Sequence, residues 1–244
     1  MASEAGLKEN LRELGKYSAC DVSDALLKLQ KPASGEVARA GYLADIQPFA
    51  LGKVPLYESH RYGKVIAPAR TLKLVSKGAK IEALPEGSKH AVPKGSHWAD
   101  ITESGTILVI EQPEGQGCAA VGGIMAQKMK FNGVEACVVS GRVRDQQELK
   151  DSELPIFATG KSTVGSGAES SVYGHNLPVT IKGVKVSPGD IVFCDPSEGV
   201  VVIPQDLLDD TIQLMPRLVA ADDKVKEAVK EGMAVAVAFK KFRG

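Results

Sequence analysis

Two opposite charges, Arg144 and Asp145, come shortly after the apolar segment GVEACVVSG at residues 133–141. An aspartate can hold a hard divalent cation through one carboxylate oxygen while the cation keeps several waters, which suits magnesium. The donor fork of an arginine can stabilise negative charge that develops on a substrate oxygen. Glu148 would share a helical face with Asp145, where it can hold a metal-bound water or simply be solvated. An arbitrary Arg-Asp pair is more often a salt-bridged helix start, so the surroundings must decide.

A pair of glycines, Gly122 and Gly123, opens a predicted helix whose interior is residues 124–131. The unpaired N–H groups of such a start bind anions, and glycine lets a carboxylate or phosphate approach the backbone closely. Close packing is an equally good reason for two glycines. The segment 133–141 predicts a buried strand that ends in a turn at Gly141, and α/β folds bind ligands beyond the carboxyl ends of strands. The glycines and the charges should therefore share one space, which favours a site for an anionic, metal-chelating molecule.

The rest of the chain predicts one α/β domain over residues 1–244 with helices at both ends. In the N-terminal part, 1–31, apolar residues at helical spacing restart after a Ser18 cap and predict two short helices. The C-terminal part, 205–244, is helical in period, with Pro216 breaking or kinking the helix. Between these parts the patterns predict a surface connection over 31–64, a strand pair over 64–77, a helical turn at 95–101, a strand at 106–110 and several short strands after residue 154.

Composition limits the kinds of partner. Lys and Arg number 30, Asp and Glu number 30, and 43% of the residues are hydrophobic, so no net charge draws the chain to nucleic acid or an anionic membrane. No apolar run approaches the roughly 20 residues of a membrane span, and the start lacks a basic region followed by an apolar stretch. A small molecule or a protein is the expected partner, and the cytoplasm is the expected compartment. Reduced core cysteines without metal spacing are predicted at Cys20, Cys118, Cys137 and Cys194.

The glycines and charges also resemble a family signature. Gly123, twenty intervening residues, Arg144-Asp145, two residues and Glu148 match the pattern G-x20-R-D-x2-E/D of the RraA-like family. That family includes class II 4-hydroxy-4-methyl-2-oxoglutarate aldolases and the regulator of ribonuclease activity A. The resemblance extends over nearly the whole chain through CDVSDALLKL, GSHWADI, VSPGDIVFCDPSEGVVVIP and FKKFR. The connection after residue 31 and the GSHWADI and FKKFR segments look most similar to fungal members.

This resemblance implies a swivelling β/β/α-type fold, assembled as a trimer or as a hexamer of two trimers, with sites at subunit boundaries. It also implies a lyase of 2-oxo acids that depends on a divalent metal, Mg²⁺ or Mn²⁺. By motif match, Asp145 would anchor the metal and Arg144 would contact the substrate, so these two residues are the predicted catalytic pair. The backbone N–H groups at the helix start would bind the pyruvoyl carboxylate. The predicted substrate-binding residues are therefore Gly122, Gly123, Ile124 and Met125, together with Arg144.

Two further implications concern acids. Many relatives carry Asp or Glu at the position that matches Gly123, where the acid orients a water that handles protons; with glycine here, another group must transfer the proton. The family also has an acidic residue that reaches in from the C-terminal helical region of a neighbouring subunit. Asp222 or Asp223 is the candidate in this chain, against the alternative of a solvated helix start.

Two function classes remain open. Breaking the C3–C4 bond of a 4-hydroxy-2-oxo acid, or losing the C4 carboxylate of oxaloacetate, leaves the same pyruvate enolate, which a metal and an arginine can stabilise. The alternative is a non-catalytic regulator that binds a protein partner such as a ribonuclease. The set of Arg144, Asp145 and Glu148 favours the enzyme, because a pure binding module has no need of a metal-anchoring carboxylate beside an anion site.

Other reactive side chains carry weaker signals. Lys161, in GKSTVGSG, has no neighbours that indicate the desolvation a Schiff-base lysine needs. Metal-ligand spacing is absent from the four histidines His60, His90, His97 and His175. His97, beside Trp98, is expected to be a packed, hydrogen-bonded core residue.

Overall fold

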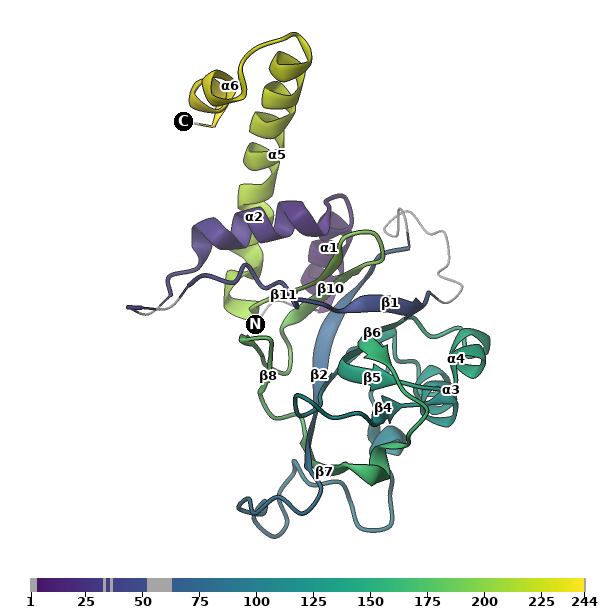
Figure 1. Cartoon of the computed structure of the whole chain (residues 1–244). Helices are drawn as coiled ribbons and strands as arrows, with labels where there is room; N and C mark the ends of the chain where they lie inside the picture. Colours follow the sequence, from purple (N-terminus) through teal and green to yellow (C-terminus); the bar gives the residue numbers. More distant parts are fainter. Residues whose placement is uncertain (1–3, 33, 36, 52–62, 244) are drawn as a thin grey trace.

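Four parallel strands form the centre of the fold (Figure 1). The computed structural model describes residues 4–32, 34–35, 37–51 and 63–243; His60 and part of the 31–64 connection lie outside them. The parallel neighbours are, in spatial order, β6 (Ile156–Lys161), β5 (Ala136–Val143), β3 (Ile107–Glu111) and β2 (Val65–Ser76). Burial is nearly continuous along β3 and along the first half of β5, as expected for parallel strands covered on both faces, whereas buried and half-buried residues alternate along much of β2.

Antiparallel strands extend this centre into a nine-stranded sheet. β1 (Gln47–Ala50) pairs with β6 at one edge, and the hairpin of β10 (Ile191–Asp195) and β11 (Gly199–Ile203) pairs with β2 at the other. β4 (Ala119–Val121) pairs with β5, and β7 (Ser170–His175) pairs with β2. A separate hairpin of β8 (Val179–Ile181) and β9 (Val184–Val186) packs its buried valines and isoleucine against β2 and β3.

Helices cover the sheet in two groups. α1 (Glu4–Leu14), α2 (Ala19–Leu29) and α5 (Leu208–Lys230) share one apolar cluster with β10 and β11. The second group packs against β3, β5 and β6 and comprises α3 (Gly123–Phe131), α4 (Gln146–Asp151) and the 3-10 turn η1 (Trp98–Ile101). The remaining elements are η2 (Ser166–Ala168), η3 (Gln205–Leu207) and α6 (Val235–Phe242). None of the helices in the described part of the chain is both long and apolar enough to cross a membrane.

Several predicted elements are confirmed. The structure is a mixed α/β domain with flanking helices, and the two N-terminal helices, the helical turn before β3 and the strand β3 itself are present. The Ser18 cap is also present, since Ser18 Oγ accepts the Asp21 N–H at 3.1 Å and Asp21 Oδ2 accepts the Ser18 N–H at 2.8 Å. This reciprocal pair satisfies two donors that a helix start leaves unpaired.

The predicted strand pair over 64–77 is wrong, because the segment forms the single long strand β2. Its first residues pair with β10 up to Pro68, and its pairing with β3 begins at Ala69. Proline cannot donate a ladder hydrogen bond, and here it falls where the strand exchanges one partner for another. A local pattern cannot distinguish a turn from such an exchange.

Two smaller expectations change in part. Of the two effects expected of Pro216, the break is wrong: α5 runs through Pro216 as one helix, because Met215 and Leu218 on either side pack in the same apolar cluster and offset the lost hydrogen bond. Three cysteines are buried as predicted, but Cys20 is exposed at the first turn of α2. Hydrogen bonding to Glu198, and then partial burial, raise the pKa of the Cys20 thiol to about 11. Exposure therefore does not make this thiol reactive at neutral pH.

Candidate functional site

The start of α3 lies beside the end of β5, since β4 leads into α3 and pairs in parallel with β5 (Figure 1). The Arg144 N–H donates to the Val121 carbonyl at 3.0 Å, which ties the end of β5 to the residue before Gly122. The two chain segments leave their strands at one edge of the sheet. The structure thus brings together the glycine pair and the Arg-Asp pair, which are about twenty residues apart in the sequence.

The first turn of α3 offers backbone donors. Gly122 is its N-cap and supplies no side-chain hydrogen bond, and the first N–H groups of a helix have no acceptor within it. One of them, from Gly123, donates to Asp145 Oδ2 at 3.2 Å. The N–H groups of Ile124 and Met125 belong to the same turn, at the positive end of the helix dipole. The Ile124 side chain is exposed, whereas Met125 packs against the core.

Asp145 has a backbone conformation that few residues other than glycine adopt. It precedes α4 with φ 59° and ψ 49°, in the left-handed region. This conformation costs roughly 1–2 kcal/mol for most L-residues, and Asp and Asn tolerate it best. The carboxylate makes no cap hydrogen bond to α4 and instead reaches the start of α3. Strained residues of this kind cluster at functional sites.

Each glycine of the pair leaves room for one carboxylate. A Cβ built on Gly122 would lie 2.6 Å from Asp145 Oδ2, closer than real Cβ atoms come to other atoms. A Cβ on Gly123 would overlap the side chain of Glu148, including its Cβ and Cδ atoms. The glycines therefore let two carboxylates approach the first turn of α3. Two reasons for a pair of glycines follow from the sequence, close packing and anion binding. The structure shows close packing, and the side chains packed on the glycines are the two carboxylates predicted to bind metal.

Arg144 lies at the rim of this site. Its side chain is 42% exposed, and its Nε atom is 3.4 Å from Asp145 Oδ2. Ion pairs this exposed contribute little to stability. The ion pair between Arg144 and Asp145 therefore adds little to the stability of the fold, and the exposed guanidinium is accessible to a ligand in solvent. It also lies beside Gly165, a loop residue that no sequence motif marked out.

The predicted turn at Gly141 is wrong, because β5 continues to Val143. The register with β6 shifts between Val139 and Arg142, which marks a bulge. The buried Gln112 side chain fills the space that a Gly141 side chain would need, and its Oε1 accepts the Arg142 N–H at 3.0 Å. Gln112 thus supports the strand end that carries the Arg-Asp pair. An isolated glycine inside a strand pattern was the signal for such a close approach.

The oxygen donors at this site fit a hard divalent cation. Asp145 and Glu148 place two carboxylates at one helix start, and in the described part of the chain no three His, Cys, Asp or Glu residues are grouped to hold a metal. A full protein cage for zinc or calcium would need more ligands. Mg²⁺ takes one or two carboxylates and keeps several waters, so the donor set suits Mg²⁺ and the chemically similar Mn²⁺.

The predicted acids of the neighbouring subunit lie far from this site within one chain. Asp222 and Asp223 are on α5, which extends away from the sheet, whereas α3 and α4 lie on the sheet (Figure 1). Asp222 Oδ1 accepts a hydrogen bond from Arg243 Nε at 2.5 Å, and Asp223 Oδ1 accepts one from Lys226 at 3.1 Å. The fold of a single chain therefore does not bring either acid to Asp145.

Two other reactive side chains, His97 and Lys161, lack the surroundings of a catalytic group. His97 Nδ1 accepts the Ala99 N–H at 3.2 Å, and its ring centroid is 5.2 Å from that of Trp98. His97 is thus packed and hydrogen-bonded, but it caps η1 at the surface, so the expected core position is wrong. Lys161 ends β6 as an exposed residue, without the desolvation that would activate an amine.

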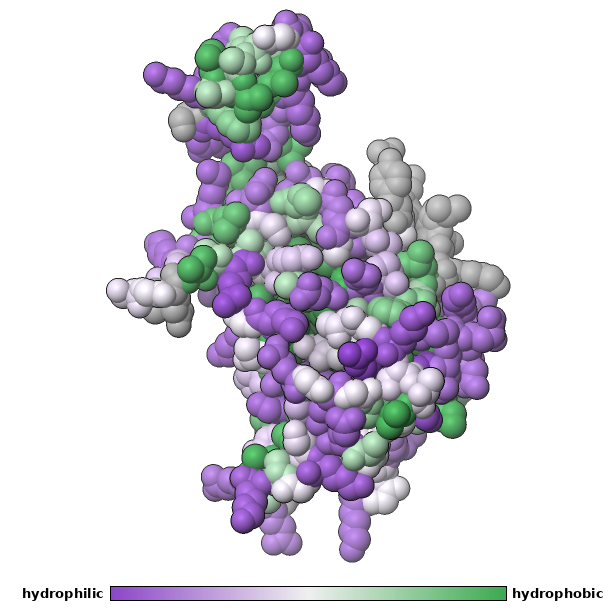
Figure 2. Space-filling model, viewed as in Figure 1, coloured by the Kyte–Doolittle hydropathy of each residue, from purple (hydrophilic) through white to green (hydrophobic). Residues whose placement is uncertain are grey.

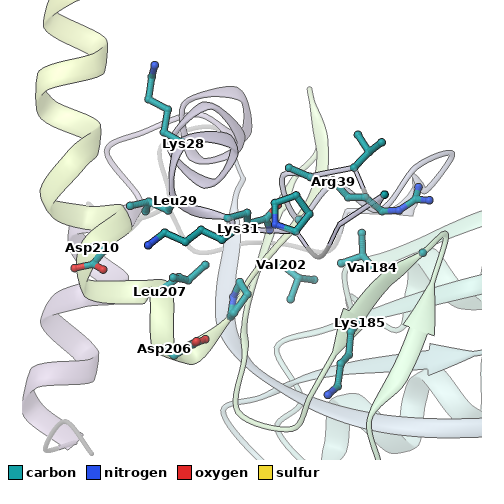
Figure 3. A pocket seen from close by; sticks show the side chains of 18 residues that line it. Lys28, Leu29, Lys31, Arg39, Val184, Lys185, Val202, Asp206, Leu207 and Asp210 are labelled. Carbon is teal, nitrogen blue, oxygen red and sulfur yellow. The ribbon is translucent and has the colours of Figure 1, made fainter.

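A wide groove of about 960 Å³ lies elsewhere, between the end of α2, β9 and η3 (Figure 3). None of the predicted site residues lines it. Figure 3 shows its charged side chains diverging: Lys28 and Lys185 point away at opposite ends, and Lys31 extends toward Asp210. No charged centre for a small anion results. The residues able to do chemistry gather at the start of α3 instead.

This chain belongs to the RraA-like family, because the family model described as Aldolase/RraA matches residues 19–202. That span includes both glycines of the pair, Arg144, Asp145 and Glu148, and it ends before Asp222 and Asp223. Nearly the whole sheet and the start of α3 thus lie in the part of the chain that the family model matches.

Three individual relatives each share less than a third of their residues with this chain over the aligned regions. DlpA of Legionella pneumophila is 28% identical over 225 residues, 91% of this chain, but the chain spans only 32% of that protein. A Halalkalibacterium halodurans protein named "Putative 4-hydroxy-4-methyl-2-oxoglutarate aldolase" is 27% identical over 73% of this chain and 77% of its own length. Streptomyces coelicolor RraAS2, described as an unusual member of the RNase ES inhibitor RraA protein family, shares the fold with a TM-score of 0.65 at 24% identity, over 92% of this chain and 96% of its own. The closer likeness to fungal members stays a prediction.

Proposed function

We propose that this protein is a divalent-metal-dependent lyase that cleaves 2-oxo acids to pyruvate. The observation that carries the proposal is the meeting of Asp145, Glu148 and Arg144 at the start of α3, whose N-cap glycine has no side chain. Its substrates are 4-hydroxy-4-methyl-2-oxoglutarate, oxaloacetate or both. Membership of the RraA-like family and the aldolase name of one relative support the first of these.

Mg²⁺ or Mn²⁺ would be held directly by Asp145 and through a water by Glu148. When bound, the metal supplies Lewis-acid stabilisation of the charge on the 2-oxo oxygen. The left-handed conformation of Asp145 turns its carboxylate toward the place where the substrate would bind, and the Gly123 N–H orients that carboxylate.

The chain itself would bind and polarise the substrate. The N–H groups of Ile124 and Met125 would donate to the C1 carboxylate at the positive end of α3. Arg144 would direct its donors to the 2-oxo oxygen, where charge develops as the C3–C4 bond breaks and its electron pair moves to C3. CO₂ leaves from oxaloacetate, and a second pyruvate leaves from the hydroxy acid after its 4-hydroxyl loses a proton. In both reactions the enolate that remains takes a proton from water at C3 to become pyruvate. Only the hydroxy acid has a 4-hydroxyl, so only its cleavage needs a base. Gly123 has no side chain to accept the hydroxyl proton, so another group must act as the base.

An assay of pyruvate release tests the proposal. With Mg²⁺ or Mn²⁺, the protein should release pyruvate from both substrates, and oxaloacetate should turn over at least as fast, because help from a general base is typically worth about 10²–10⁴-fold. Coupling to lactate dehydrogenase measures the product. EDTA should abolish the activity, and added metal should restore it. Absence of metal-dependent pyruvate from both substrates would contradict the lyase, and a strong preference for the hydroxy acid would place an unidentified base in the site.

The C-terminal helices support assembly of several copies. α5 carries α6 away from the sheet as an arm, and Figure 2 shows apolar side chains over α6. Val235, Val237 and Phe239 are 51%, 56% and 41% exposed, and such patches mark interaction surfaces. We propose that this arm packs on a neighbouring copy in a trimer or hexamer and that Asp222 or Asp223 reaches the neighbour's site.

Light scattering after gel filtration tests this assembly. The expected mass is three or six times the 25.8 kDa of one chain. A Val237→Glu substitution should lower the mass and the lyase activity together, because a charge would replace an apolar contact. Val37→Glu, at a residue that is 80% exposed and lines the groove at the end of α2 instead of the surface of α6, is the control. A wild-type monomer with full activity at micromolar concentration would contradict shared sites.

The second candidate function is a non-catalytic regulator that binds a protein partner such as a ribonuclease. The exposed apolar residues of α6 favour it, because they could serve a different protein as well as a second copy. This function gives no role to the two carboxylates over Gly122 and Gly123. The lyase is therefore the better supported proposal.

A further inference from the structure

The Arg144 side chain lies between two glycines from different loops. A Cβ on Gly122 would be 3.2 Å from both Cγ and Nε of Arg144. A Cβ on Gly165 would be 3.1 Å from Nη1, 3.5 Å from Cζ and 3.8 Å from Nη2 of the same side chain. The aliphatic part of Arg144 therefore faces the side of Gly122 that has no side chain, and its guanidinium faces the corresponding side of Gly165. We call this space the glycine slot.

Backbone hydrogen bonds fix the second wall of the slot. The Ser162 N–H donates to the Val143 carbonyl at 2.9 Å, and the Ala119 N–H donates to the Val164 carbonyl at 2.8 Å. Gly165 also forms a parallel bridge with Ala119. The loop is thus tied to β4 and β5, which end directly before Gly122 and Arg144. Its position relative to the guanidinium follows from the sheet itself.

Space, and not backbone conformation, accounts for the glycine at position 165. Its φ of −75° and ψ of 156° are open to any residue. At Gly167, two residues further along the same loop, a Cβ would meet no atom within 4 Å, so a side chain there would not face Arg144. These two glycines form a matched pair, because a side chain would meet Arg144 from one and open space from the other.

The contrast with Arg142 shows what the slot achieves. Arg142 Nε donates to the Gln116 carbonyl at 3.3 Å, and its Nη1 donates to the Lys161 carbonyl at 3.1 Å, so two of its donors are committed to backbone carbonyls. Within the described residues, Arg144 makes its ion pair to Asp145 through Nε. The guanidinium of Arg144 has room in the slot because Gly122 and Gly165 carry no side chain, and its ion pair to Asp145 does not use the terminal nitrogens.

We propose that Gly165 is a positioning residue of the site, which with Gly122 holds the Arg144 guanidinium in the orientation that binds the substrate's oxyanion. This inference rests on the proposed function, because it takes the ligand of Arg144 to be the oxyanion of a 2-oxo acid. A Cβ at position 165 would make the guanidinium shift by a few tenths of an ångström, and the branched side chain of valine would displace it further, whereas the three atoms nearest to that Cβ do not include any of Asp145. Binding of an enolate-like anion should then weaken while metal binding stays intact.

The test uses the full-length protein with Gly165→Ala, Gly165→Val and the matched controls Gly167→Ala and Gly167→Val. Oxalate, a dianion shaped like the pyruvate enolate, is the probe, titrated by calorimetry in the presence of Mn²⁺. The Kd for oxalate should rise about 10- to 100-fold in Gly165→Val and less in Gly165→Ala, since misplacement by about 1 Å can cost 10²-fold. The Kd for Mn²⁺ alone and the melting temperature should stay at wild-type values, and the Gly167 variants should bind oxalate within about twofold of wild type.

Crystal structures of wild type and Gly165→Val separate this inference from the proposed function. Displacement of Arg144 from the slot in the variant supports the inference even if wild type releases no pyruvate, an outcome that would remove only the lyase assignment. Arg144 in an unchanged position, or wild-type oxalate affinity in Gly165→Val, would overturn it. Equal losses in the Gly165 and Gly167 variants would also overturn it, because the effect would then come from the loop as a whole.

Discussion

Replacing Asp145 with asparagine should abolish metal-dependent pyruvate release and leave the fold intact. Asparagine tolerates the left-handed conformation at φ 59° as well as aspartate does, and its amide oxygen can still accept the Gly123 N–H. Only the charge is lost. A metal contributes several kcal/mol of charge stabilisation, and each ~1.4 kcal/mol is tenfold in rate, so turnover should fall by roughly 10³-fold or more.

The matched control is Asp151→Asn, which removes a carboxylate from the other end of the same short helix, α4. It should keep full activity and wild-type affinity for Mn²⁺ measured by calorimetry. Asp145→Asn should lose measurable Mn²⁺ binding while its melting temperature and circular dichroism match wild type. Metal-dependent turnover that survives in Asp145→Asn would show that another residue anchors the metal, and it would remove the central residue of the proposed site.

Replacing Gly123 with alanine should destabilise the protein and lower its activity, although a glycine-to-alanine change usually raises the free energy of unfolding. Gly→Ala at a compatible position normally stabilises by about 0.4–1 kcal/mol. Here the new Cβ would overlap the Cβ and Cδ of Glu148, and a rotamer change cannot move the Glu148 Cβ. α4 must shift instead, and Asp145 precedes that helix. We expect a loss of about 1–3 kcal/mol in the free energy of unfolding and a loss of roughly 10²-fold in turnover.

A double-mutant cycle identifies the contact responsible. Glu148→Gly removes the overlapping atoms, so Gly123→Ala should cost less stability in that background, with a coupling of about 0.5–3 kcal/mol. Urea unfolding measures the four free energies. Gly167→Ala, where a side chain meets no neighbour, should be close to neutral. Equal costs of Gly123→Ala in both backgrounds would rule out Glu148 as the reason for glycine. The same overlap leaves no room for an aspartate at position 123 unless Glu148 moves.

Much of the fold is present in local patterns. Apolar periodicity and the Ser18 cap predict α1 and α2, and β-branched runs predict β3 and β5, because these elements bury a face that the sequence itself defines. The juxtaposition of the glycine pair with Arg144 and Asp145 also follows from sequence. One helix and one strand span the twenty intervening residues, and the ends of neighbouring strands meet at one edge of a sheet.

Errors arose where distant segments decide a residue's environment. The sequence predicts a turn at Gly141. In the structure Gly141 lies inside a strand, and glycine is required there because the side chain of Gln112, at the end of β3, occupies the space of a Cβ. The sequence also predicts a strand pair over 64–77, but the change of partner at Pro68 depends on β10, more than a hundred residues away. Cys20 is exposed because only one face of α2 packs on the body. No local pattern contains these contacts.

By itself, the sequence determined the α/β class, the family resemblance and the grouping of Gly122, Gly123, Arg144 and Asp145, since all depend on periodicity and spacing along the chain. Only the tertiary structure decided why those glycines are glycines: Asp145 and Glu148 occupy the space above them, and Gly165 from a separate loop completes the contact with Arg144. It also decided that Asp222 and Asp223 lie on an arm remote from the site of their own chain. Volume exclusion between segments far apart in sequence acts only once the chain has folded.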